Sequence, residues 1–213
     1  MDEEPYWRPS RMVRVGISVE GLTEERFIKI LIDPHLSPKG IYVTPVSMDG
    51  NVSIGRVRHE LKNLIYSFDY VSTFYDFYGF KHKDDGETKL TLEAKINESV
   101  KVELREKVIP YVQMYEFEGL LFSSPGAIAS VLQDESLINW ANRILEEHND
   151  NPEKVNDSRE TAPSKRLEKA TNYRKTTHGP NIAKEIGLLK IREMCSGFDL
   201  WLKKLEELRL NGF

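Results

Sequence analysis

Cysteine is nearly absent from this 213-residue sequence, which contains only Cys195. One cysteine cannot build an internal disulfide framework, and it leaves no thiol cluster for a structural zinc ion. The sequence also lacks an apolar run long enough to cross a membrane, and its first residues are acidic where a secretory signal would be basic and then apolar. We therefore expect a soluble, cytoplasmic protein.

The sequence has no excess of basic over acidic residues. The 30 Lys and Arg residues stand against 34 Asp and Glu residues, which gives a formal net charge of -4. The molecule as a whole therefore exerts no general attraction on nucleic acid or on an acidic membrane surface. A polyanionic partner has to be met by a local basic patch or by bound metal ions.

Glycine-rich phosphate-binding loops and local signatures of nucleophilic catalysis are absent as well. The stretch Gly16-Ile-Ser-Val-Glu-Gly21 lacks the second glycine of the dinucleotide fingerprint, and no Gly-Lys-Ser or Gly-Lys-Thr sequence occurs. No local signature indicates Ser/His/Asp or Cys/His catalysis. The carboxylates therefore become the main candidates for chemistry.

The sequence is organised around an apolar run that ends in an acid and a glycine. β-branched residues recur at every second position from Val13 to Val19, which is typical of a buried strand. Gly21 allows the turn that follows, and Thr23 is expected to cap the next helix. Glu20 therefore lies at the tip of a strand, where open α/β sheets bind their ligands.

Glu24, in the first turn of that helix, admits two interpretations. An acid at this position often only complements the helix dipole. The same position also faces the edge of the sheet at which ligands bind. For Glu20 a purely structural role is less satisfactory, because a carboxylate at the end of a buried strand costs desolvation free energy unless something pairs with it.

The same arrangement recurs twice along the chain. Tyr70 to Gly79 is a β-prone run that contains Asp76, and a strand over residues 109–114 is followed by Glu116 and Glu118. Strand and helix patterns alternate, so the strands are expected to be parallel and their carboxyl ends to share one edge. The two glutamates face one side only if the strand continues through them. If a helix begins there, one of them is a dipole partner instead.

The remaining patterns complete an α/β architecture. Ile41 to Val46 is expected to be an edge strand, because Pro45 lacks a backbone donor. Residues 81–107 form a charged excursion, and residues 148–159 have the composition of a mobile loop. Helices are expected over residues 23–33, 54–68, 90–100, 127–132, 137–147, 182–195 and 198–208.

These elements predict two parts within one fold. Residues 1–125 form an α/β core with a mainly parallel central sheet flanked by helices. Residues 126–213 form a helical C-terminal part that packs on the core and carries a basic loop. Ser164 is expected to cap a helix in this second part.

The chemistry follows from the kind of ligand that is available. Converging carboxylates without cysteine or clustered histidine are hard oxygen ligands, which suit Mg²⁺ or Mn²⁺. An ion held by Glu20, Asp76 and either Glu116 or Glu118 would neutralise phosphate charge, activate a water and stabilise the leaving oxygen. Metal ions rather than net protein charge would then receive a polyanion.

Basic residues in the second part are candidates for phosphate contacts. They are Lys165, Arg166, Arg174, Lys175 and His178. Each of them also has an interpretation without a functional role. Basic residues on a helix face are commonly solvated. A single histidine before Gly-Pro commonly only forms hydrogen bonds in a loop.

Five segments of the chain occur in a recognisable order. They are Val19-Glu-Gly-Leu-Thr-Glu24, Tyr75-Asp-Phe-Tyr-Gly79, Tyr115-Glu-Phe-Glu-Gly-Leu-Leu-Phe122, Glu160-Thr-Ala-Pro-Ser-Lys-Arg166 and His178-Gly-Pro180. Together they resemble the DUF4276 family of Toprim-like proteins. The resemblance extends from about residue 13 to residue 205.

The resemblance implies a Toprim-type fold, as in topoisomerases, primases and nucleases of the overcoming-lysogenization-defect type. In that fold a glutamate after the first strand and an Asp-x-Asp after a later strand hold Mg²⁺. Glu20 matches the first glutamate, Asp76 matches the first aspartate, and Glu24 resembles a second acid of the nuclease branch. The resemblance also implies a component of a bacterial antiphage system, often beside an ATPase.

One position departs from the pattern of the family. Tyr78 stands where the second aspartate belongs. A second metal ion would therefore need Glu116 or Glu118 as a replacement ligand.

The sequence thus predicts a Mg²⁺-dependent or Mn²⁺-dependent phosphodiesterase that acts on DNA or RNA. Glu20, Asp76 and Glu116 are the expected catalytic metal ligands, supported by Glu24 and Glu118. One rival is a non-catalytic Toprim-fold subunit that binds nucleic acid or an ATPase through the same carboxylates. Another is phosphotransfer on a small nucleotide.

Overall fold

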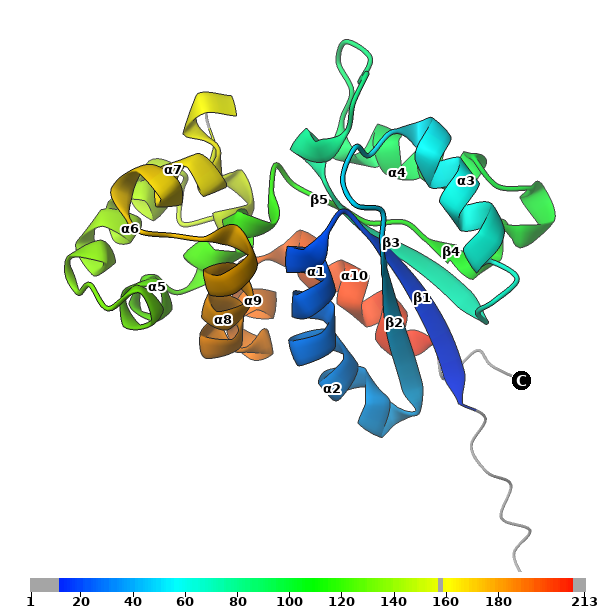
Figure 1. The fold of residues 1–213 in the computed structure, drawn as a ribbon, viewed down its shortest axis with the longest axis horizontal. Coiled ribbons are helices and arrows are strands. Elements are labelled where there is room, and N and C mark those ends of the chain that lie inside the picture. Colours follow the sequence, from blue (N-terminus) through cyan, green and yellow to red (C-terminus); the bar gives the residue numbers. More distant parts are fainter. Residues whose placement is uncertain (1–11, 157–158, 209–213) are drawn as a thin grey trace, which may run out of the picture.

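A parallel five-stranded sheet forms the centre of the molecule (Figure 1). The structure is a computed structural model, and it describes residues 12–156 and 159–208. The strand order is β2-β1-β3-β4, and β5 also pairs with β3. The strands are β1 (Val13–Val19), β2 (Ile41–Ser47), β3 (Tyr70–Asp76), β4 (Val108–Ile109) and β5 (Val112–Gln113).

The position of each strand follows from its residues. β1 lies between β2 and β3, and its apolar side chains are buried as the alternation predicted. β2 lies at the edge, where Pro45 is tolerated because no outer strand needs its missing donor. Gly16 lets Phe68 approach closely, since a Cβ at this position would lie 2.6 Å from the Phe68 ring.

The strand expected over residues 109–114 is interrupted, which corrects the sequence interpretation. Pro110 has no backbone donor, so β4 ends before it and β5 begins two residues later. Between them, the Tyr111 N–H donates to the Thr73 hydroxyl at 2.9 Å. A side chain of β3 therefore replaces the missing backbone pairing.

Helices cover both faces of the sheet (Figure 1). One face packs against α3 (Ile54–Leu64) and α4 (Lys89–Glu98). The other packs against the N-terminal helices and part of the C-terminal helices. The remaining helices are α1 (Leu22–Phe27), α2 (Asp33–Leu36), α5 (Pro125–Leu132), α6 (Ser136–Glu147), α7 (Pro163–Ala170), α8 (Lys175–Ile186), α9 (Leu188–Met194) and α10 (Ser196–Glu207).

The first helix differs from the prediction at both ends. It begins at Leu22 with Gly21 at the N-cap, so Thr23 is not the cap. It continues through a π-helical turn, Ile28–Ile32, into α2 and a final turn at Ser37–Lys39, where a loop was expected. The helix can continue because Pro34 lies in the first turn of α2, where its missing donor is tolerated.

The C-terminal helices also differ from the prediction. Gly187, at φ +78, divides the helix expected over 182–195 into α8 and α9. Ser164 lies inside α7 rather than at its cap, because Ala162 is the N-cap residue. The His178-Gly-Pro180 segment lies inside α8 rather than in a loop.

The segment 148–159 is attached to the rest of the molecule at several of its described residues. Pro152–Lys154 form a short 3-10 turn, and Val155 is fully buried. The Glu153 carboxylate accepts hydrogen bonds from the backbone N–H groups of Gly197 and Phe198. Residues 157–158 of this segment lie outside the described residues.

The two predicted parts share one hydrophobic core. Phe27 of α1 packs against Phe74 of β3 and against Phe198 of α10, with ring centroids 5.7 and 5.9 Å apart. The division near residue 125 stays a prediction, and residues 1–11 and 209–213 lie outside the described residues.

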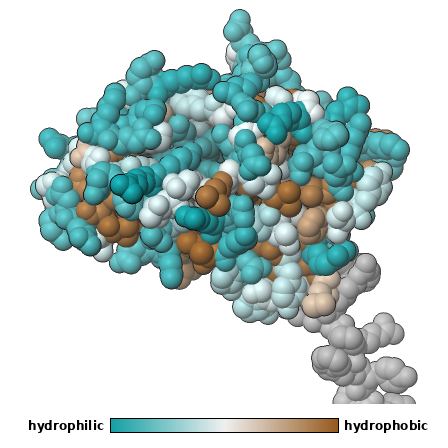
Figure 2. Space-filling model, viewed as in Figure 1, coloured by the Kyte–Doolittle hydropathy of each residue, from teal (hydrophilic) through white to brown (hydrophobic). Residues whose placement is uncertain are grey.

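Hydrophilic residues cover most of the face drawn in Figure 2, and hydrophobic residues appear there in small groups. Within residues 12–156 and 159–208, no helix is long and apolar enough to cross a membrane.

Candidate metal centre

Four acidic residues meet at the carboxyl end of the parallel sheet. Glu20 directly follows β1, and Asp76 is the last residue of β3. Glu24 comes from the first turn of α1, and Glu118 from the 3-10 helix Phe117–Ser123 that follows β5. The shared direction of the strands brings these acids together.

Three of these acids are held in place by one carboxylate oxygen each. Glu24 Oε2 accepts the Gly21 N–H at 3.0 Å, which closes the capping box of α1. Asp76 Oδ1 accepts the Phe117 N–H at 2.7 Å. Glu118 Oε1 accepts the Tyr173 hydroxyl at 3.1 Å.

The second oxygen of each acid points to a common place, which Lys175 Nζ occupies. The ammonium lies 3.4 Å from Asp76 Oδ2, 3.4 Å from Glu118 Oε2 and 3.9 Å from Glu24 Oε1. Glu24 therefore caps the helix with one oxygen and turns the other toward the cluster. The arrangement presents three fixed oxygens to one cation.

Glu20 lies beside this cluster in a different way. Its Oε2 is buried and has no hydrogen-bond partner among the described residues. A Cβ on Gly79 would lie only 2.0 Å from that atom, so the glycine makes room for the carboxylate. Glu20 as a whole is half-buried, but its Oε2 atom lacks the partner that its desolvation requires.

Burial raises the pKa values of all four acids. Desolvation is the largest cause in each, and Lys175 offsets only part of it. The pKa of Glu24 rises to about 7, and the pKa of Asp76 rises well above its usual range. The repulsion among the acids adds to this effect, so one ammonium does not satisfy the cluster.

The pKa of Lys175 is also raised, but for a different reason. Burial alone would lower the pKa of the Lys175 ammonium, but the negative charges of Glu118, Asp76 and Glu24 outweigh it and raise that pKa well above its usual range. Lys175 therefore carries a positive charge at the centre of the acids. Sequence analysis assigned this residue to phosphate binding and did not foresee its contacts with the acids.

Glu116 lies at the margin of the cluster. Its Oε2 accepts the Ser164 N–H of α7 at 3.0 Å. Its negative charge still contributes to the raised pKa values of Glu20 and Glu118. Of the two candidate replacement ligands, Glu118 is therefore the one that faces Lys175.

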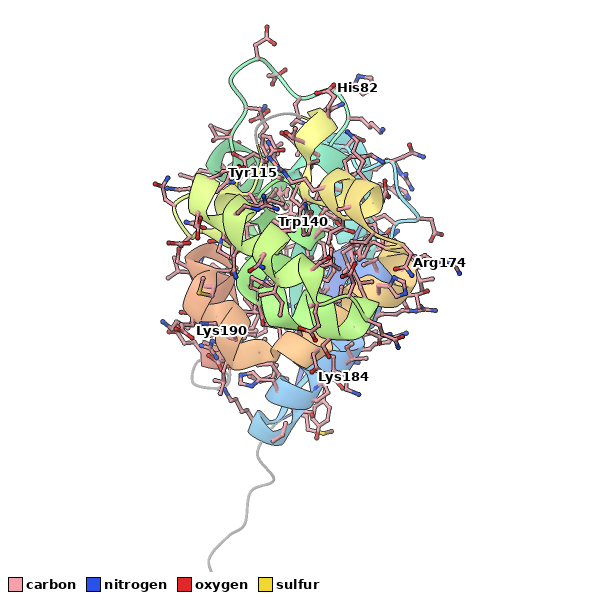
Figure 3. All side chains as sticks on the ribbon, turned by 90° about the vertical axis from the view of Figure 1, so that its left-hand side faces the viewer. His82, Tyr115, Trp140, Arg174, Lys184 and Lys190 are labelled. Carbon is pink, nitrogen blue, oxygen red and sulfur yellow. The ribbon has the colours of Figure 1, made fainter. Side chains whose placement is uncertain are left out.

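The other predicted phosphate contacts lie on the two helices that approach the cluster. Lys165 is exposed on α7 and pairs with Glu168 at 2.8 Å, and Arg166 Nε donates to the Thr161 carbonyl. On α8, His178 Nδ1 accepts the backbone N–H of Arg174 at 3.0 Å. Arg174 lies at the outer margin of the molecule in Figure 3.

Two residues that position the acids were not predicted from the sequence. Tyr173 donates to Glu118, and Gly79 makes room for Glu20. The position of Gly79, three residues after the end of β3, was visible in the sequence as part of a recurring pattern. Nothing in the sequence connected Tyr173 with Glu118, because 55 positions separate them.

The comparison with protein families settles the identity of the chain at the level of the family. A family model described as "Domain of unknown function (DUF4276)" matches residues 19–206. The chain belongs to the DUF4276 family. The resemblance carried by the five sequence segments is thereby confirmed. No match is found among proteins of curated description.

Two solved structures resemble this DUF4276 protein. The C-terminal region of the Burkholderia pseudomallei OLD protein aligns with a TM-score of 0.54 and 17% sequence identity, covering 93% of this chain and 99% of that one. The C-terminal region of the Xanthomonas campestris pv. campestris OLD protein aligns with a TM-score of 0.46 and 17% identity, covering 92% and 95%. The first likeness shows a shared fold. The predicted class, a mainly parallel central sheet flanked by helices, is confirmed.

The residues of the DUF4276 protein can be tested for their fit to a divalent ion. Within the described parts of the chain, no group of three or more His, Cys, Asp or Glu side chains lies close enough together to hold a metal ion. The donor set nevertheless suits Mg²⁺, because it consists of carboxylate oxygens and includes unsatisfied buried atoms on Glu20, Glu24 and Glu118. The fit requires the Lys175 ammonium to leave the centre.

Proposed function

We propose that this DUF4276 protein is a divalent-metal-dependent phosphodiesterase that cleaves DNA or RNA. The observation that supports this most strongly is that the two oxygens of each of three carboxylates have different roles. Glu24, Asp76 and Glu118 each bind the protein with one oxygen and direct the other to one point. Carboxylates held in this way are preorganised to hold a cation.

Mg²⁺ or Mn²⁺ suits this donor set best. Glu24, Asp76 and Glu118 would hold the ion, with Glu20 beside them and Glu116 at the margin. A bound ion would neutralise phosphate charge and supply an activated water. Lys175 would then be free to neutralise the substrate phosphate, as the sequence analysis expected of this residue.

The same proposal includes the residues that contact phosphates and the cellular role of the protein. Lys165 and Arg166 lie on α7, His178 lies on α8, and Arg174 directly precedes α8. The first turns of these helices approach the acids at Ser164 and Lys175. We infer that these residues hold flanking phosphates. The family resemblance supports a cytoplasmic role in bacterial antiphage defence, beside an ATPase.

A second candidate function is favoured by Lys175 itself. Its ammonium already lies among the acids, and Tyr78 replaces an aspartate that the resemblance places in the metal site. In that case the DUF4276 protein is a non-catalytic subunit that binds nucleic acid or an ATPase. The acids and Lys175 then form a structural ion-pair cluster.

One experiment separates the two functions. The purified chain is incubated with single-stranded DNA, duplex DNA and RNA in Mg²⁺ or Mn²⁺, beside the variants Glu20→Gln and Asp76→Asn. Cleavage is expected from the unaltered chain and at least about a 100-fold lower rate from each variant, because even outer-shell ligand changes cost 10-fold to 100-fold. Exposed Glu146→Gln is the matched control.

Thermal unfolding in the same buffers gives the second measurement. An ion at a hundredfold excess over its dissociation constant should add about 2.7 kcal/mol to the free energy of unfolding, and Asp76→Asn should remove that increment. Absence of cleavage on every substrate, together with unfolding temperatures that the metals do not change, would support the non-catalytic subunit and contradict the phosphodiesterase.

A further inference from the structure

Two tyrosines lie side by side at the margin of the acidic cluster. Tyr78 follows Asp76 by two residues, and Tyr115 directly precedes Glu116. The Tyr78 N–H donates to the Tyr115 carbonyl at 3.0 Å, and the ring centroids are 5.5 Å apart. Both side chains are half-buried. Each ring therefore keeps accessible surface next to the candidate metal ligands.

Positive charges surround these rings. The Arg159 guanidinium lies 5.6 Å from the centroid of the Tyr78 ring, and Lys83 Nζ lies 5.1 Å from the centroid of the neighbouring Phe77 ring. Burial lowers the pKa of Lys83, and the positive charges of Arg159 and Lys81 lower it further. Three cations are thus gathered near an aromatic surface.

A cavity adjoins this group of cations. Its volume is about 400 Å³, and Lys81, His82 and Lys83 line it. The acidic residues of the same cavity, Asp84 and Glu87, are both paired with Lys95. His82 and Tyr115 both lie in the upper part of the molecule in Figure 3. Lys83 lines this cavity and also lies over the Phe77 ring, so the cavity and the aromatic group share this basic residue.

The backbone at Tyr115 gives a further reason to look for a function. Its φ is +59°, a left-handed conformation that is a genuine outlier for a bulky side chain. Glycine or asparagine adopts this conformation at lower cost. The hydrogen bond with Tyr78 uses only the Tyr115 backbone carbonyl, which any residue supplies. The Tyr115 side chain adds a tilted ring contact with Tyr78. A tyrosine at this position therefore serves the ring pair with Tyr78 rather than the backbone turn.

We propose that Tyr78 and Tyr115 form a stacking surface for an unpaired base of a single-stranded nucleic acid. Lys81, Lys83 and Arg159 bind the phosphates that flank this base. Aromatic rings stack on any base whose face is exposed, and a base inside a duplex does not offer its face. The inference rests on the proposed function and narrows its substrate to single strands. It also gives Tyr78 a role in place of the missing aspartate.

The test measures binding without metal, so that no cleavage occurs. The full chain is titrated into a fluorescein-labelled, mixed-sequence single strand, as DNA and as RNA, and into the corresponding duplexes. We expect tighter binding to both single strands than to the duplexes. Tyr115→Asn and Tyr78→Leu should each weaken single-strand binding about 10-fold, within the range for losing one stacked base.

Three comparisons separate stacking from damage to the fold. Tyr115→Asn should unfold at the same temperature as the unaltered chain or higher, because asparagine tolerates the positive φ. Tyr78→Phe should recover most of the affinity that Tyr78→Leu loses, because the ring returns without its hydroxyl. Tyr66→Leu is the matched control, since Tyr66 is 74% exposed on another part of the surface.

The outcome distinguishes this inference from the proposed function. Folded Tyr115→Asn and Tyr78→Leu variants that bind single strands as tightly as the unaltered chain overturn the stacking surface, even if the chain cleaves nucleic acid. Equal loss of binding to duplex and single strand overturns it as well. A chain that binds single strands through these tyrosines but cleaves nothing supports the stacking surface and contradicts the phosphodiesterase.

Discussion

Glu20 is the acid whose position depends most on a neighbouring residue. Glu24, Asp76 and Glu118 are each fixed by a hydrogen bond, but Glu20 Oε2 is buried against Gly79 and accepts none from the described residues. A side chain that is placed by packing alone moves when the packing changes. Gly79 therefore controls where the Glu20 carboxylate lies.

The substitution Gly79→Ala should displace Glu20 without unfolding the protein. The new Cβ would lie 2.0 Å from Glu20 Oε2, and the end of a flexible side chain can move away at low cost. Cleavage should fall roughly 10-fold to 100-fold, because small misplacements of catalytic groups have effects of this size. Initial rates and thermal unfolding are measured together. Gly126→Ala is the control, since its Cβ would meet only the Ser124 hydroxyl at 4.0 Å. Equal rates for both variants would exclude a catalytic role for the observed Glu20 position.

At the scale of single residues, the sequence was informative about strand ends and uninformative about distant partners. Glu20 and Asp76 could be selected because each follows an apolar strand, and that signal is local. The contact between Lys175 and Asp76 joins residues 99 positions apart. It depends on how α8 packs, which no local pattern encodes, and so Lys175 was assigned to phosphate binding alone.

At the scale of elements, the polar segment before α7 has a structural role that its composition concealed. Glu153 accepts the Gly197 and Phe198 N–H groups at 2.9 and 3.1 Å, at the start of α10. Further along α10, Trp201 Nε1 donates to the Ser72 hydroxyl of β3 at 2.9 Å. Residues 148–159 were interpreted as a mobile loop because turn-forming composition predicts local flexibility and carries no information about a capping contact with a distant helix.

Removing this contact should weaken the attachment of α10 to the sheet. Glu153→Ala leaves two N–H groups at a helix start without their carboxylate, which should lower the free energy of unfolding by about 1–2 kcal/mol. Chemical denaturation measures the change, and Glu146→Ala, an exposed glutamate of α6, serves as the control. Unfolding midpoints that coincide for the two variants would show that water replaces the carboxylate without loss.

At the scale of the whole molecule, the net charge is moderate although acidic residues are concentrated at one place. The chain carries a formal net charge of -4, yet Glu20, Glu24, Asp76 and Glu118 lie together at one edge of the sheet. Among the described residues, Lys175 is the basic residue that forms ion pairs within this group. Such a cluster favours folding when it is protonated or when it holds a cation. A rise in pH should therefore lower the free energy of unfolding, and a bound divalent metal ion should raise it.

Glu24 allows this dependence to be predicted with its sign. Burial raises the pKa of Glu24 from 4.5 to about 7 on folding, so between these pH values the folded chain binds more protons than the unfolded chain. The free energy of unfolding of the metal-free protein should therefore fall as pH rises from about 4.5 to about 7. At pH 8, Glu24→Gln should be more stable than the unaltered chain by roughly 3 kcal/mol. Glutamine can still accept the Gly21 N–H, so the capping box is retained.

Urea denaturation across this pH range, with and without Mg²⁺, measures both effects. Mg²⁺ should restore more stability at pH 8 than at pH 5, because the metal binds deprotonated carboxylates, and Glu24→Gln should reduce this gain. Glu25→Gln is the control, since Glu25 lies on the same helix and pairs with Lys29 away from the cluster. If Glu24→Gln and Glu25→Gln follow the same pH profile as the unaltered chain, then the acids are already satisfied by Lys175, and the cluster is an ion-pair network rather than a cation site.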